Sequence, residues 1–207
     1  MITRGAAWLI LLSITACAEG TAFAQGIGGK GSPLRPGPAT SYSTKQTNNG
    51  LTIAALPYDD VEKLKPYFGK TNLLQFGIFP VMLILQNDTG KALNLETLEL
   101  HYVTADRLRL EETPASEVQY LDGPRRPRVG QQTPLPIPIP RGKAKSKLAI
   151  PEITGFAFNA KMLPAGESAH GFVYFQTTHQ RGSKVYVRGI TEAATRKELL
   201  FFEVSLE

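Results

Sequence analysis

The pattern of apolar and polar positions along the chain is dominated by residues 76–87 (FGIFPVMLILQN), of which ten are apolar, Gly or Pro. Within residues 81–85 the odd and the even positions are both apolar, a pattern typical of a strand that is covered on both faces. A helix is the alternative, but Pro80 and Gly90 leave fewer than ten residues between them, which is a strand-like length. The pattern therefore predicts a central β-strand that ends at the turn before Gly90.

Shorter runs indicate further strands before and after this one. Residues 51–56 (LTIAAL) precede it, and residues 93–104 follow it. In the second of these runs the apolar positions change phase, which predicts a bulge or break at Glu96 and Thr97. His101 then falls on the polar side of the strand, so we interpret it as a surface residue.

The last third of the chain carries the clearest strand pattern. Three runs are rich in β-branched and aromatic side chains and are bounded by turn residues: 169–176, 184–190 and 198–206. A turn at residues 162–167 precedes them. In the last run the side chains expected to face the core are Leu200, Phe202, Val204 and Leu206.

Short helices are expected between the strands. Asp59 has the position of an N-cap, with Glu62 three residues later. The apolar stripe of this helix consists of Val61, Leu64 and Phe68. It is a candidate cover for the second face of the central strand. Residues 113–121 begin with Thr-Pro, a common helix start, whereas residues 153–158 fit either a strand or a single helical turn.

The composition agrees with one mainly β domain. The chain has 207 residues, of which 15 are proline and 19 are glycine, and these separate short apolar runs as they do in all-β proteins. We predict an Ig-like antiparallel β-sandwich over residues 51–207, with one or two short helices. A long loop, rich in proline and basic residues, is inserted at 122–148.

The start of the chain is typical of an exported bacterial protein. A basic residue precedes an uninterrupted run of eleven mostly apolar residues at 6–16, too short to cross a bilayer but the usual length for the core of a signal peptide. Two kinds of processing fit it: lipid modification of Cys17, or cleavage between Ala24 and Gln25. Both stay open, with a slight preference for the lipid anchor because Cys17 is the only cysteine in the sequence.

The signal peptide therefore spans residues 1–24, or 1–16 in a lipoprotein, and a flexible linker is expected at 25–50. The linker is rich in Gly, Ser, Pro, Thr and Asn with few large apolar residues. Burial therefore cannot offset the entropy that ordering would cost. We expect the protein in the periplasm or cell envelope, attached to a membrane only if Cys17 carries a lipid.

The positive charge of the chain is concentrated in the loop at 122–148. The candidate contact residues of this loop are Arg125, Arg126, Arg128, Arg141, Lys143, Lys145 and Lys147. The run TPLPIPIP at its centre favours an extended polyproline II conformation. The loop is either a contact site for envelope proteins or anionic surface groups, or a solvated insertion. Because no aromatic residues alternate with the charges, nucleic acid is not expected as a partner.

The sequence contains no recognisable catalytic or cofactor motif. None of the short spacings of zinc sites links His101, His170 and His179, and neither a phosphate-binding glycine loop nor a nucleophile elbow occurs. We therefore expect no catalytic residue, no metal and no cofactor. A metal site in which these histidines converge in space is the alternative.

Several segments, taken in order, resemble a family of uncharacterised exported bacterial proteins, many of which have lipoprotein-type signals: LTIAALPYDD, EKLKPYFGK, GIFPVMLILQNDTGKAL, YVTADR, PLPIPIP, LPAGESAHGFVYFQ and LLFFEVSL. The resemblance covers residues 51–206. Its most specific parts are the Gly-x-x-Pro-Val entry to the central strand, which ends in Asn-Asp, and the proline-rich run. The resemblance implies the fold and export, and it brings no activity, cofactor or catalytic residue with it.

Strong strand patterning without catalytic motifs favours a non-catalytic cell-envelope protein that acts as a protein- or surface-interaction module. One alternative is a metal-dependent or hydrolytic enzyme whose site is not visible in the sequence. Another is a carbohydrate-binding module, which requires exposed aromatic residues on one face. The candidates for that role are Tyr174, Tyr186 and Phe201.

Overall fold

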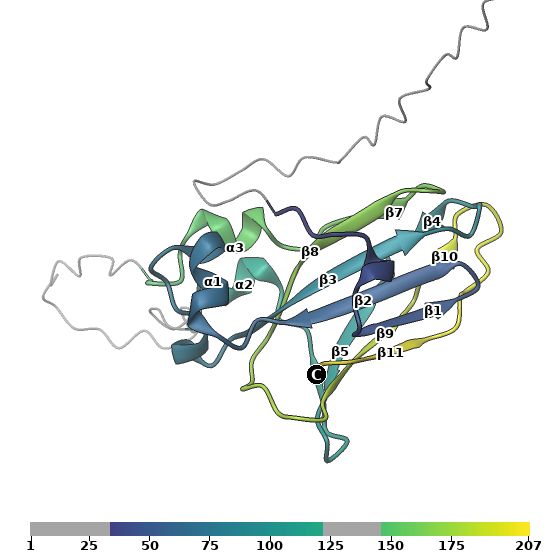
Figure 1. Ribbon diagram of the computed structural model, residues 1–207. Helices are drawn as coiled ribbons and strands as arrows, with labels where there is room; N and C mark the ends of the chain where they lie inside the picture. Colours follow the sequence, from purple (N-terminus) through teal and green to yellow (C-terminus); the bar gives the residue numbers. More distant parts are fainter. Residues whose placement is uncertain (1–33, 122–145) are drawn as a thin grey trace, which may run out of the picture.

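The computed structural model describes residues 34–121 and 146–207, which form antiparallel sheets and a few short helices (Figure 1). The first sheet has the order β1 (Lys45–Asn48), β2 (Leu51–Pro57), β3 (Phe79–Asn87) and β8 (Ser168–Phe175). The second has the order β11 (Phe202–Ser205), β9 (Lys184–Arg188), β5 (Glu99–Val103) and β6 (Arg109–Glu111). A small third sheet contains β10 (Thr191–Glu192), β4 (Leu93–Asn94) and β7 (Met162–Leu163). The mainly β prediction is confirmed.

The first and second sheets share one hydrophobic core, and β3 lies at its centre. The odd-numbered residues of the run 81–85 are fully buried in this core, together with Tyr102 and Val187 from the second sheet. The even-numbered residues, Met82 and Ile84, belong to a separate cluster on the other side of the first sheet. β3 is therefore covered on both faces, as its unbroken apolar pattern predicted.

That separate cluster lies between the first sheet and its helical cover, in which α1, α2 and α3 gather at one end of the strands (Figure 1). The helices are α1 (Val61–Phe68), α2 (Ala115–Val118), α3 (Pro151–Gly155) and the 3₁₀ turns η1 (Ala39–Ser41) and η2 (Leu74–Phe76). In α1 Leu64 and Phe68 are buried, and the Phe68 ring centre lies 5.2 Å from that of Phe172 in β8. No helix among the described residues is long and apolar enough to cross a membrane.

The helix start differs from the prediction by one residue. The N-cap of α1 is Asp60, whose carboxylate accepts a hydrogen bond from the N–H of Glu62 at 2.9 Å. Asp59 pairs instead with Lys63, one turn along the helix, at 3.0 Å. This Lys63 contact lowers the pKa of Asp59, against the opposing effect of burial, which is the larger single contribution. Val61 follows the cap and is exposed, so the buried part of the predicted stripe is shorter than expected.

The predicted break at Glu96 and Thr97 is confirmed, because β4 and β5 lie on either side of it in different sheets. The N–H of Leu98 donates to the carbonyl of Leu95 at 3.0 Å and closes a turn. The hydroxyl of Thr97 donates to the carbonyl of Gly189 at 2.7 Å, which ties this turn to the end of β9. The change of phase in the sequence therefore marks the point where the chain passes from the third sheet to the second.

The packed structure includes part of the segment in which a linker was expected. Within residues 34–50, Ala39 is fully buried and β1 pairs with β2 along its whole length. The carbonyl oxygen of Leu34 lies 3.0 Å from Nε2 of His170 in β8. This segment contributes an edge strand and part of the cover of the first sheet.

The prediction for the last strand is wrong at Leu200, whose side chain is 65% exposed. β11 begins only at Phe202. Before it, the N–H of Leu199 donates to the carbonyl of Ile190, so the chain reaches the sheet from a turn and the alternation does not extend back to Leu200. The later positions are buried as expected: Phe202, Val204 and Leu206.

Candidate functional site

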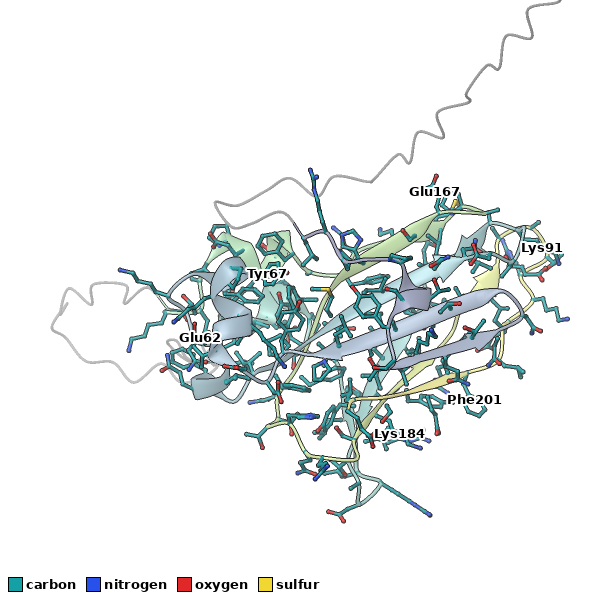
Figure 2. All side chains as sticks on the ribbon, in the orientation of Figure 1. Glu62, Tyr67, Lys91, Glu167, Lys184 and Phe201 are labelled. Atoms are coloured by element: carbon teal, nitrogen blue, oxygen red, sulfur yellow. The ribbon has the colours of Figure 1, made fainter. Side chains whose placement is uncertain are left out.

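The outer faces of the two large sheets differ in how they are covered. The outer face of the first sheet lies under α1, α2 and α3 and under residues 34–42. Over the outer face of the second sheet, no helix packs within the described ranges. Figure 2 shows Phe201 and Lys184 on the side formed by β9 and β11, away from α1 with its Glu62 and Tyr67. This uncovered face is the candidate binding surface.

Tyr186 of β9 is at the centre of this surface. Its ring stacks on that of Phe201, with ring centres 5.3 Å apart and planes 28° apart. The guanidinium carbon of Arg109 in β6 lies 4.9 Å from the Tyr186 ring centre, a cation–π distance. The sheet order places β11 on one side of β9 and β6 on the other, so the two groups reach Tyr186 from opposite directions. Below, the aromatic face means Arg109, His101, Tyr186 and Phe201.

Two ion pairs flank the aromatic face. Arg188 of β9 donates to the Glu99 carboxylate of β5 at 2.7 Å, and this carboxylate raises the pKa of Arg188. Lys184 of β9 lies 3.4 Å from the Glu203 carboxylate of β11. All of these charges are solvent-exposed, so each pair contributes little to the free energy of folding. Their effect is to give a surface with aromatic groups at its centre and both signs of charge at its edge.

His101 of β5 pairs directly with Tyr186 across the sheet, with ring centres 6.2 Å apart and the planes at 62°. Its side chain is half-buried among these neighbours, more covered than a surface residue would be. Its Nδ1 atom is buried and has no hydrogen-bond partner among the described residues. His101 is therefore a half-buried polar group at the base of the aromatic face, with a buried ring nitrogen that no described residue pairs.

The structure does not bring the three histidines together. His170 contacts the carbonyl of Leu34 on the helix side of the first sheet, and burial lowers its pKa. His179, in the loop after β8, stacks on Phe79 with ring centres 4.9 Å apart. Within residues 34–121 and 146–207, no three His, Cys, Asp or Glu residues are grouped so that they could hold a metal ion.

Most of the residues singled out from the sequence as lipidation, cleavage or contact sites lie outside the described ranges. Lys147 is described, and it is exposed. The others are Cys17, Ala24, Gln25, Arg125, Arg126, Arg128, Arg141, Lys143 and Lys145.

The aromatic residues considered for carbohydrate binding separate into two groups. Tyr174 is fully buried, and its hydroxyl donates to the carbonyl of Ile153 in α3 at 2.8 Å, so it cannot contribute to a surface. Tyr186 and Phe201 are the stacked pair described above. Arg109 was missed by the sequence analysis, because β6 is only three residues long and shows no alternation to place its side chain.

Comparison of the chain with models of protein families, with curated proteins and with solved structures found no match in any of the three. The resemblance to exported bacterial proteins therefore stays a prediction from the sequence.

Proposed function

We propose that this protein is a non-catalytic interaction module of the bacterial cell envelope, with an Ig-like sandwich fold, that binds a protein partner through the aromatic face. The observation that carries the proposal is the asymmetry of the two large sheets. One outer face is covered by helices, whereas no described helix covers the other, which presents a stack of Arg109, Tyr186 and Phe201 across the sheet.

The residue types of this stack suit protein recognition. Tyr and Arg are enriched among the residues that dominate binding energy at protein interfaces. Tyr186 and Arg109 already pack on each other, so less side-chain freedom remains to be lost on binding. Phe201 is 50% exposed, and the adjacent Leu200 is exposed as well. An exposed apolar group beside a ring stack with flanking charges is a common feature of interaction surfaces.

The location in the envelope rests on the sequence alone. The support is the apolar run at 6–16 with its two processing sites, together with the resemblance to exported proteins. If the protein is exported, the partner that it binds must also be in the cell envelope.

The test is site-specific photocrosslinking in the native host. Phe201→benzoylphenylalanine places the reactive group on the aromatic face, and Met162→benzoylphenylalanine, at an equally exposed apolar position in the third sheet, is the matched control. We expect discrete crosslinked protein species from position 201 that are absent from position 162. Equal crosslinking from both positions, or none from position 201, would contradict the proposal.

A carbohydrate ligand is the second candidate, and the exposed ring of Phe201 is the observation in its favour. A sugar needs a free ring face, and at Tyr186 the ring is already approached by Phe201 and Arg109. That leaves one available ring, which is why we favour a protein partner. Retention of the wild type, but not of Phe201→Ser, on insoluble cell-wall polysaccharide would reverse this preference.

A further inference from the structure

A surface pocket of about 300 Å³ lies away from the aromatic face, between the second sheet and the segment that precedes β7. Its apolar wall includes Leu95, Leu100 and Phe158. Its polar residues include Glu96, Glu112 and Lys161. A few polar groups around an apolar hollow are typical of small-molecule sites.

Glu112 is placed toward this pocket by the alternation of β6 and its continuation. Leu110 packs against the shared core, and Glu112, two residues later, takes the next position on the same side of the strand. Its N–H donates to the carbonyl of Leu100 at 3.2 Å, which extends the pairing of β6 with β5 to this residue. A carboxyl group therefore occupies a position where an apolar side chain would ordinarily complete the core.

The Glu112 carboxyl group is half-buried and has no hydrogen-bond or ion-pair partner in the part of the chain that the structure describes. Burial raises its pKa to about 7. Removing an ionised carboxylate from water without giving it a partner costs free energy. A cation in contact with the carboxylate would offset that cost.

We propose that this pocket binds a small molecule with an apolar body and a single amino group. The ammonium group pairs with the Glu112 carboxylate, and the apolar body packs on Leu100 and Phe158. Charge complementarity selects a cation, because the pocket offers an unpartnered carboxylate at its apolar wall.

The other charged groups that line the pocket act on a bound ammonium group in opposite directions. Glu96 adds negative charge, which attracts the cation, whereas Lys161 adds positive charge, which repels it. Tyr174, in the neighbouring β8, stays neutral, because burial and the nearby Glu112 raise its pKa. Removing the Lys161 charge should therefore strengthen the binding of an amine. A purely apolar pocket would show no such effect of charge.

The experiment is a titration of the full chain with benzylamine, followed by ¹H–¹⁵N NMR, with benzyl alcohol as the uncharged probe of the same shape. We expect shifts confined to amides around Leu100, Glu112 and Phe158, with binding at least about tenfold tighter for the amine. The affinity should fall on going from pH 8 to pH 5.5, because Glu112 becomes protonated while benzylamine keeps its charge. Lys161→Gln should increase the affinity.

Glu112→Gln keeps the shape of the side chain and removes its charge, so it should abolish the preference for the amine. Glu111→Gln is the matched control, because Glu111 is the exposed neighbour on the opposite side of the strand. Equal binding of both probes, unchanged amine binding by Glu112→Gln, or no shift at millimolar benzylamine would overturn the proposal. None of these outcomes depends on Phe201, so the result is independent of the function proposed for the aromatic face.

Discussion

The side-chain oxygen of Gln46 accepts a hydrogen bond from the main-chain N–H of Glu203 at 2.5 Å, although 157 residues separate them in the chain. Gln46 lies in β1, the outer strand of the first sheet, and Glu203 lies in β11, the outer strand of the second. The bond therefore joins the two large sheets at one edge. It also occupies a main-chain donor that an exposed edge strand would otherwise offer to another chain.

Gln46→Ala should expose this donor. We expect faster hydrogen exchange of the Glu203 amide and a loss of about 1 kcal/mol in the free energy of unfolding, the usual contribution of one hydrogen bond. Native-state exchange followed by NMR measures the first effect. Asn48→Ala, in the same strand, is the control and should leave the Glu203 amide unchanged. If Gln46→Ala also leaves it unchanged, the bond does not protect this edge.

Gly189 and Gly166 allow strain to be separated from steric contact. Both have a positive φ, of 80° and 78°. A Cβ at Gly189 would lie 1.9 Å from the carbonyl oxygen of Thr97, whereas a Cβ at Gly166 would meet nothing within 4 Å. Gly166→Ala should therefore cost about 1 kcal/mol from the backbone conformation alone. Gly189→Ala should lower the free energy of unfolding by at least about 2 kcal/mol more. Urea denaturation measures both losses. Equal losses of stability in the two variants would show that the turn at Thr97 shifts to accommodate the added Cβ without cost.

Asn87 ties the end of β3 to β7. Its side-chain nitrogen lies within hydrogen-bond distance of the carbonyls of Lys91, Leu163 and Pro164, at 2.7, 3.0 and 2.9 Å. The residue is fully buried, so Asn87→Ala leaves these acceptors without a donor, and we expect a loss of about 3 kcal/mol in unfolding free energy. Asn159→Ala, at an exposed position, should change the stability by less than about 0.5 kcal/mol.

A double-mutant cycle measures the stack at the centre of the aromatic face. Tyr186→Ser and Phe201→Ser should show a coupling energy of about 0.5–1.5 kcal/mol, because the rings lie 5.3 Å apart. The same cycle with Tyr186→Ser and Met162→Ser should give a coupling near zero, since Met162 belongs to a different sheet. The readout is the midpoint of urea denaturation for each single and double variant. A zero coupling for the first pair would mean that the rings are not stacked in solution.

The pKa of Glu112, raised to about 7 from its ordinary value of 4.5, predicts a stability that falls as pH rises. Between these two values the folded protein holds the proton and the unfolded chain has released it, so each increase in pH favours unfolding. The stability of the wild type relative to Glu112→Gln should fall by on the order of 1–3 kcal/mol across this range and level off above pH 7. Unfolding curves at pH 4.5, 6 and 8 measure it. Glu111→Gln, compared with the wild type in the same way, should show no such trend.

Local patterns predicted the parts of the fold that depend on neighbours in the chain. The two-sided cover of β3 follows from its unbroken apolar run, and the passage between sheets follows from the phase change at Glu96 and Thr97. Leu200 was misplaced because alternation alone does not show where a strand begins, and the turn at Leu199 interrupts it. β1 was not predicted, because its polar residues form an edge strand with no apolar face to mark it.

The sequence by itself determined the strands that carry an apolar pattern, though not the polar edge strand β1, because the side-chain period of a strand is a local property of the chain. Only the tertiary structure decided which strands are neighbours, and hence that Arg109, Tyr186 and Phe201 meet on one face. It also decided that Tyr174 is buried under α3 and that Glu112 lines a pocket. The physical reason is that sheet order and register bring together residues that are far apart in the chain, and no local period records that pairing.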